Sequence, residues 1–369
     1  MNSPEERHDK LIRATDLDAL SCRNSINEKN YLQPKDEFIN DLINSYQTYL
    51  QYSQGYSSLS SSRTLKAQFL SKKLPIINRG TYMRTKIITD FIQKYIDYFG
   101  GVCQILSLGS GSDTRAFHLL STNPMTKYHE IDFPESTRIK KLGILNNPRL
   151  MKLLSIDPLD IPSVKSKESF NDLDPNLHTN RYHLHGLDLR GLNSITQIKG
   201  LDTNLPTLII SECVLCYLSP EEYRSTIEIC TNFGNENLTS FLIYEPMSLK
   251  DSFGSTMNQN LMGRGLNLQT FDEYPDLESR LRFFKDMCKL SNIRMTDISN
   301  VAGYNKNSPA WIDDIELRRI NSLEMIDEIE EIKLLLEHYC LVYGEFRNSP
   351  NAPTFSGVDD FNWLLKHDH

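Results

Sequence analysis

The chain has 369 residues, 39% of them hydrophobic, and a formal net charge of −8 at pH 7. This length allows a large buried core, and the acidic balance, with no lysine- or arginine-rich block, disfavours nucleic acid as a partner. The N-terminus has no apolar targeting segment, and no apolar run is long enough to cross a membrane. The seven scattered cysteines suit reduced thiols. We therefore expect a cytoplasmic or nuclear protein without membrane association.

The N-terminal hundred residues are predicted to be mostly helical and contain no βα unit. Within them, the Ser- and Tyr-rich stretch 51–63 is predicted to be a mobile loop. Ligands of open α/β sheets bind outside the carboxyl ends of the strands. We therefore expect residues 1–100 to form a helical lid over that edge, and residues 101–369 to form the main α/β part of one integrated domain.

From residue 104 onward, short β-rich runs alternate with helical patterns, which is typical of a parallel α/β sheet. Strands are predicted at 104–109, 127–133, 181–189, the first half of 207–218, 240–247, 293–301 and 339–346. Helices are predicted from about 113, at 136–147, from 219, at 274–290 and at 327–338, and the polar stretch 160–180 is predicted to be a surface excursion. The pattern indicates an α/β fold with a mostly parallel seven-stranded sheet, one antiparallel edge strand and helices on both faces.

The first predicted strand runs into a turn with two glycines, Gly109 and Gly111, in the stretch QILSLGSGSDTRAFHLL. Free backbone N–H groups and the lack of side chains make such a turn a candidate nucleotide cradle. Thr114 replaces the third glycine of the dinucleotide fingerprint, which disfavours a dehydrogenase. Asp132 lies 23 positions after Gly109, at the end of the next predicted strand. This pattern is typical of S-adenosylmethionine-dependent methyltransferases, in which the acid accepts hydrogen bonds from the ribose hydroxyls. The alternative is a tight βα turn with an incidental aspartate.

Two more acidic residues follow later strands. Asp188 closes the string HGLDL, and Glu212 lies in the apolar string IISEC. With Asp132, they would bring three carboxylates to one edge of the sheet. Asp188 has a helix N-cap as its alternative role, whereas an acidic residue inside so apolar a strand as that of Glu212 needs a partner.

Five strings resemble the leucine carboxyl methyltransferase family: LSLGSGSDTRAFHL, HEIDFPE, GLDLR, ISECVLCYLSPEEY and, upstream, PIINRGTYMRT. The resemblance extends from about Asn24 to Phe346. It implies the class I S-adenosylmethionine-dependent methyltransferase fold. It also implies methylation of the C-terminal leucine α-carboxylate of the protein phosphatase 2A catalytic subunit, forming a methyl ester that regulates assembly of the phosphatase holoenzyme.

The resemblance also implies roles for individual residues of this chain. Arg84 would bind a carboxylate, either that of the methionine part of the cofactor or that of the substrate leucine, and these two roles stay open. Lys29 and Tyr217 match positions near the substrate. The cofactor S-adenosylmethionine would contact Gly109 and Gly111 at the turn, Asp132 through its ribose, Asp188 and Leu189 at its adenine end, and Glu212 through its amino group.

The reaction would need no general base, because a terminal carboxylate has a pKa of about 3.3–3.7 and is already a nucleophile at neutral pH. Alignment and desolvation would supply the acceleration. Two alternatives remain, a small-molecule carboxyl or hydroxyl methyltransferase and a phosphatase-binding regulator without turnover. We expect a monomer without a metal site, since Cys213 and Cys216 have no second metal-ligating pair and His129, His183 and His185 suit structural roles.

Overall fold

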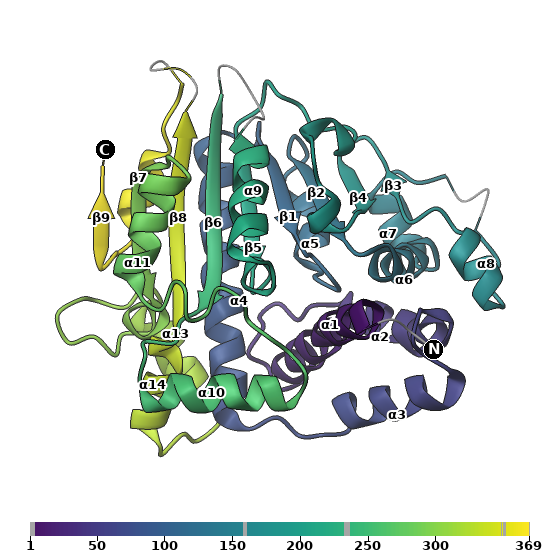
Figure 1. Cartoon of the computed structure of the whole chain (residues 1–369), viewed down its shortest axis with the longest axis horizontal. Coiled ribbons are helices and arrows are strands. Elements are labelled where there is room, and N and C mark those ends of the chain that lie inside the picture. The colour runs from purple at the N-terminus through teal and green to yellow at the C-terminus, as the bar shows by residue number, and fades with distance from the viewer. Residues whose placement is uncertain (1–3, 158–160, 232–236, 348, 350–351, 369) are drawn as a thin grey trace.

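The structure is a computed structural model that describes residues 4–157, 161–231, 237–347, 349 and 352–368. Within these residues, one sheet has nine strands in the order β3-β4-β2-β1-β5-β6-β8-β7-β9. Every strand predicted from the sequence is present, as β1 (Gln104–Leu108), β2 (Lys127–Asp132), β4 (Tyr182–Gly186), β5 (Thr207–Glu212), β6 (Leu238–Pro246), β7 (Ser291–Asp297) and β8 (Tyr339–Arg347). Figure 1 shows this sheet at the centre of the molecule.

The prediction of a single antiparallel strand, at the edge of the sheet, was wrong, because the long strand β8 is antiparallel and lies inside the sheet. β8 lies between β6 and β7 and runs antiparallel to both. Residues 340–345 of β8 are buried. A strand buried in this way needs a neighbour on each side to pair its backbone groups.

Two short strands complete the sheet and were not predicted. β3 (Leu177–His178) runs antiparallel to β4 at one edge, and β9 (Leu365–His367) runs antiparallel to β7 at the other. Runs of two and three residues are too short for an alternating pattern to reveal them.

Helices cover both faces of the sheet, as predicted. β1 shows the division, because Ile105 belongs to one hydrophobic cluster while Leu106 and Leu108 belong to another. The first cluster involves α4 (Pro75–Tyr98), α5 (Arg115–Thr122), α6 (Pro134–Leu145), α7 (Pro148–Leu153), α12 (Ile298–Val301), α13 (Asp314–Asn321) and α14 (Ile329–Glu337). The second involves α9 (Pro220–Thr231), α11 (Leu277–Arg282) and its continuation η6 (Phe283–Met287). The predicted α/β fold, with helices on both faces of the sheet, is confirmed, and the sheet is mixed.

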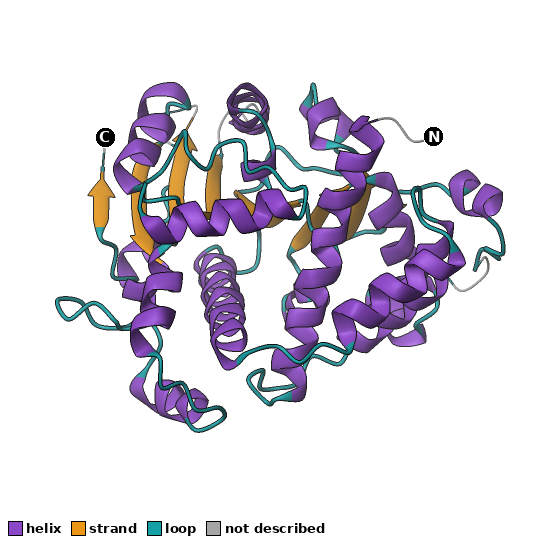
Figure 2. Cartoon of the chain, turned by 60° about the horizontal axis from the view of Figure 1, so that its bottom comes forward, coloured by secondary structure: helices purple, strands orange, loops and turns teal. Residues whose placement is uncertain are grey.

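The N-terminal helices α1 (Pro4–Glu28), α2 (Ile39–Tyr49) and α3 (Ser58–Phe69) form an added layer. Figure 1 shows them beneath the sheet, with α10 (Ser252–Gly263) beside them, and Figure 2 brings this side forward. Leu17 and Leu20 of α1 pack with Leu42 of α2 and Leu142 of α6. The layer therefore has an apolar core of its own, joined to the sheet through α6. The mostly helical character of this region is confirmed.

The segment predicted to be a mobile loop and the one predicted to be a surface excursion both contain helices. In the stretch 51–63, α3 begins at Ser58, because Ser57 and Ser60 form a reciprocal capping box that satisfies the first N–H groups of the helix. In the stretch 160–180, of which residue 160 lies outside the described residues, α8 (Lys167–Asp172) buries Phe170 against the N-terminal layer. Among the described helices, none is long and apolar enough to span a membrane.

Candidate functional site

A cavity of about 590 Å³ lies at the carboxyl ends of β1, β2 and β5, with α1 and α4 as further walls. The strand register places these ends together, since Leu108 of β1 lies opposite Ile131 of β2 and Ser211 of β5. The next residues along the three strands are Gly109, Asp132 and Glu212, and all three line the cavity. Parallel pairing therefore assembles the predicted edge of the site.

The turn after β1 requires glycine at both predicted positions. Gly109 and Gly111 have φ angles of +59° and +48°. A Cβ atom on Gly109 would come within 2.5 Å of Val214, and one on Gly111 within 2.3 Å of Asp16 Oδ1. Val214 and Asp16 thus occupy the space that a side chain would need, and both glycines line the cavity with backbone atoms alone, as in a cradle for a nucleotide.

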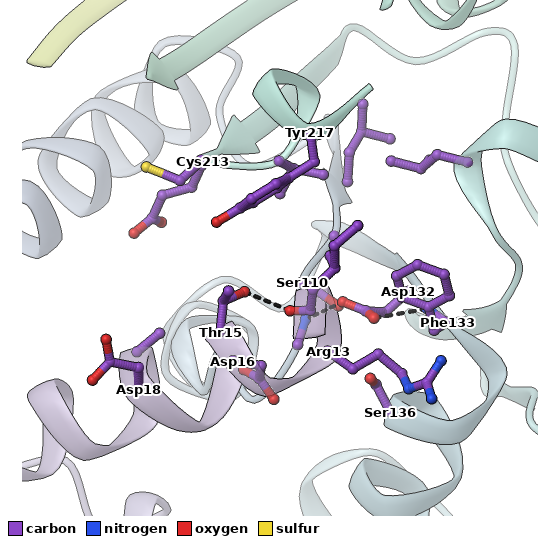
Figure 3. Close-up of a pocket in the computed structure, with 18 of the residues that line it drawn as sticks. Arg13, Thr15, Asp16, Asp18, Ser110, Asp132, Phe133, Ser136, Cys213 and Tyr217 are labelled. Carbon is purple, nitrogen blue, oxygen red and sulfur yellow. Dashed lines mark hydrogen bonds between the residues drawn. The ribbon is translucent and has the colours of Figure 1, made fainter. Parts of the chain in front are cut away.

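Asp132 closes β2 beside this turn (Figure 3). Its carboxylate accepts hydrogen bonds from the N–H of Gly111, at 2.7 Å, and from the N–H of Phe133, also at 2.7 Å. Burial raises the pKa of Asp132 to about 6, the negative charge of Asp16 adds to the rise, and the two N–H groups oppose it. At neutral pH, Asp132 therefore presents an anionic acceptor to the cavity.

Glu212 has the partners that its apolar strand predicted. Its carboxylate accepts hydrogen bonds from Nε of Arg84 and, at 3.1 Å, from an Nη of Arg115. Arg115 also pairs with Asp113 at 2.9 Å, so that Arg84, Asp113, Arg115 and Glu212 form what we call the charge cluster. Burial acts to raise the pKa of Glu212, but the two guanidinium groups outweigh it and lower the pKa. The charge cluster stays ionised at the cavity wall.

Asp188 lines the cavity together with Leu189, and it also has the N-cap role that the sequence left open. Its carboxylate accepts a hydrogen bond from the N–H of Arg190 at 2.9 Å, at the start of the short turn η3 (Leu189–Gly191). The Arg190 guanidinium pairs with Asp188 at 2.5 Å and with Asp9 at 2.9 Å. Capping orients the carboxylate, so the two roles are compatible.

Of the two residues predicted to lie near the substrate, Tyr217 lines the cavity and Lys29 does not. Tyr217 lines the cavity with Arg84, and Figure 3 shows Tyr217 and Cys213 across the cavity from Asp16. Burial raises the pKa of the Tyr217 phenol, which therefore stays protonated at neutral pH. Lys29 is not among the residues that line the described cavity and forms an ion pair with Glu324. Its role near the substrate remains a prediction that the geometry does not support.

Helix α1 supplies cavity residues that were not predicted from the sequence. Ile12, Asp16, Ala19 and Arg23 of α1 all line the cavity. Arg23 donates a hydrogen bond to Oγ1 of Thr114 at 3.0 Å and pairs with Asp113 of the charge cluster. The spacing of these positions, four, three and four residues, marks one face of a helix, and this was the available signal.

Comparisons with known proteins agree with this geometry. The family model described as leucine carboxyl methyltransferase matches residues 12–231. A relative named leucine carboxyl methyltransferase 1 from Candida albicans is 55% identical over 99% of this chain and 100% of its own length. Relatives of the same name from Debaryomyces hansenii and Caenorhabditis elegans are 50% and 30% identical, over 99% and 90% of this chain and 100% and 91% of their own lengths.

Solved structures also share similarity with the chain. A DUF574 family protein from Streptomyces avermitilis has a TM-score of 0.46 at 11% identity, over 82% of this chain and 96% of that chain. Geranyl diphosphate C-methyltransferase from Streptomyces coelicolor has a TM-score of 0.41 at 8% identity, over 80% of this chain and 86% of that chain. The family model and the curated relatives carry the assignment: this chain belongs to the leucine carboxyl methyltransferase family.

Proposed function

We propose that this chain transfers the methyl group of S-adenosylmethionine to the α-carboxylate of a C-terminal leucine, and that the acceptor is the protein phosphatase 2A catalytic subunit. The observation that carries the proposal is one cavity that joins a glycine cradle, a ribose-type acid and an ionised Arg–Glu pair. Family membership supports a leucine carboxylate as acceptor. The choice of phosphatase rests on the resemblance of the motifs, and we place the reaction in the cytoplasm or nucleus.

The residues of the cavity fit the cofactor. Gly109 and Gly111 line the cavity with backbone atoms alone, and the anionic Asp132 offers acceptors to a vicinal diol, which has two donors. Glu212 would hold the methionine amino group, and Asp188 and Leu189 would border the adenine. When bound, S-adenosylmethionine supplies an electrophilic methyl group on a positively charged sulfur.

Arg84 would bind a carboxylate without giving up Glu212. Its described hydrogen bond uses only Nε, so its two terminal nitrogens remain as donors. The guanidinium also lies over the ring of Tyr244, 5.2 Å from the centroid, which holds it in place. The remaining donors could take the cofactor carboxylate or the leucine carboxylate, and Tyr217 lies in the same cavity as a further donor.

No general base is needed, because the leucine carboxylate is already ionised at neutral pH. The chain must desolvate this carboxylate and hold one oxygen in line with the methyl group. Well-aligned reacting groups can reach effective molarities on the order of 10⁵–10⁸ M, so positioning can supply most of the acceleration. Arg84 and the walls from α1 and α4 perform this positioning.

The first experiment is intact-mass spectrometry of the phosphatase 2A catalytic subunit after incubation with the chain and S-adenosylmethionine. We expect one added methyl group that is lost in mild base and absent from a phosphatase lacking its last leucine. Tight binding of S-adenosylmethionine without an added methyl group would contradict the acceptor and point to a small-molecule substrate. Binding of the phosphatase without affinity for S-adenosylmethionine would indicate a regulator without turnover.

A further inference from the structure

Asp16 lies where helix α1 meets the glycine turn. Its Oδ1 accepts two hydrogen bonds from Ser112, one from the backbone N–H at 2.7 Å and one from the hydroxyl at 2.6 Å. Its Oδ2 accepts a hydrogen bond from the hydroxyl of Tyr46, on α2. One carboxylate therefore joins two helices of the N-terminal layer to the turn that follows β1.

The contact is close enough to shape the turn. The Cβ position of Gly111 is 2.3 Å from Asp16 Oδ1 and 2.6 Å from the Asp16 carboxyl carbon, so this helix leaves no room for a side chain there. Gly111 also donates its N–H to Asp132. Two consecutive residues of the turn, Gly111 and Ser112, are thus held by the carboxylate that ends β2 and by the carboxylate of α1; Figure 3 shows Asp132 and Asp16 near the turn.

We propose that Asp16 is a positioning residue of the cofactor site, which fastens α1 onto the glycine turn and orients the turn and Asp132 toward the ribose. This inference rests on the proposed function, because it assigns Asp16 to the cofactor half of the same cavity. Asp16 acts through Ser112 and Asp132, and we do not assign it a contact with the substrate. The contact between Asp16 and Ser112 holds α1, which is far from β1 in the sequence, at the wall of the cavity.

The charge of Asp16 distinguishes this role from simple packing. It is one cause of the raised pKa of Asp132, together with burial. Tyr46 of α2 and Ser136 of α6 also interact with Asp132, and Arg13 of α1 lines the same cavity. Arg13 pairs with Glu135 at 4.0 Å, so the charge of Arg13 is shared. Removing the negative charge at position 16 should therefore lower the pKa of Asp132.

The test measures S-adenosylmethionine affinity of the full chain by isothermal titration calorimetry between pH 5 and pH 8. In the native chain, affinity should fall as the pH drops through about 6, because Asp132 becomes protonated. Asp16→Asn should weaken binding at pH 7.5 by about three- to tenfold. It should also move the midpoint of the pH dependence down by about half to one pH unit. Weaker binding with an unmoved midpoint would show a loss of packing alone and would overturn the inference.

Asp41→Asn is the matched control. Asp41 lies on α2, accepts a hydrogen bond from Asn147 at 2.6 Å, and is not among the residues of the described cavity lining. This variant should keep both the affinity and the midpoint of the native chain. It reports what loss of one carboxylate in the N-terminal layer does by itself.

Tyr46→Phe keeps the inference testable should Asp16→Asn fold poorly. It removes the donor to Asp16 Oδ2 and preserves the aromatic packing of Tyr46, which is 4% exposed. We expect affinity to fall by about two- to threefold. Native affinity and an unmoved midpoint in Asp16→Asn, or native affinity in Tyr46→Phe, would overturn the inference. Failure of the native chain to bind S-adenosylmethionine would instead overturn the proposed function.

Discussion

Two clusters of titratable side chains, one at the cavity and one on β2, β3 and β4, differ in their charge. The charge cluster pairs guanidinium groups with carboxylates at the edge of the cavity. The second group, the histidine cluster, consists of His129, His178, His183 and His185 on β2, β3 and β4. His129 stacks on His183 with ring centroids 4.5 Å apart, and its Nδ1 is 3.3 Å from Nε2 of His185.

A buried side chain keeps its charge when an oppositely charged group pairs with it, so the partner matters more than burial. Burial and the neighbouring histidines lower the pKa of His183 to about 4 and that of His185 to about 3, so both rings are neutral at pH 7. In the charge cluster, Arg115 and Arg23 outweigh burial and hold the pKa of Asp113 well below its usual range. Of these two clusters, the charge cluster can therefore offer charge to a ligand, whereas the histidine cluster serves the fold.

Breaking the charge cluster should have the largest effect. Arg84→Ala removes the cation that we assign to a carboxylate and should lower kcat/KM for methyl transfer by about a hundredfold or more. The melting temperature should change little, because Glu212 keeps Arg115 as a partner. Transfer of labelled methyl groups to the phosphatase and thermal unfolding check both quantities. The control is Arg149→Ala, an exposed arginine paired with Glu37; native turnover in Arg84→Ala would contradict the assignment.

Asp132 tests the cofactor side of the same edge. Asp132→Ala should weaken S-adenosylmethionine binding by about tenfold or more, because a hydrogen bond to a charged group is lost, and the fold should persist. Titration calorimetry measures the affinity. Asp90→Ala, which removes an exposed partner of Lys86, should bind as the native chain does. Equal affinities in the two variants would refute the ribose role.

Protonation of the histidine cluster should change the stability of the fold and not the rate of methyl transfer. The pKa of His183 in the folded chain lies below its unfolded value of about 6.5, so the unfolded chain binds more protons as the pH falls between these values. Stability from His183 is therefore present above pH 6.5 and is lost toward pH 4. Urea unfolding at pH 7 and pH 5 should show about 2 kcal/mol more acid destabilisation in the native chain than in His183→Gln. Equal pH dependence in both would contradict the neutral cluster.

The smallest effect is expected at Lys29. Its ion pair with Glu324 lies outside the described cavity lining, and its side chain is 39% exposed. Lys29→Ala should change turnover by about twofold or less and stability by about 1 kcal/mol or less, as is usual for such pairs. Steady-state kinetics and urea unfolding measure these values. A large loss of turnover would restore the role that the motif resemblance implied for Lys29.

Local sequence patterns were sufficient to predict most of the strands and the acidic residues at their ends. Continuous apolar runs marked β1 and β5, and Glu212 was recognised as needing a partner because it interrupts one of them. The pattern did not show that β8 enters between β6 and β7, since strand order depends on pairing between residues about a hundred positions apart. It also could not show that Arg84 and Arg115 are the partners of Glu212.

By itself, the sequence determined the alternation of strands and helices, the two glycines of the turn and the family to which the chain belongs. These features are carried by neighbouring residues or by short strings. Only the tertiary structure decided that Asp16 and Arg23 of α1 contact the turn and the charge cluster, and that Lys29 does not line the cavity. The physical reason is that α1 and β1 are brought together by the packing of Leu17 and Leu20 against α2 and α6, a contact without a local signature.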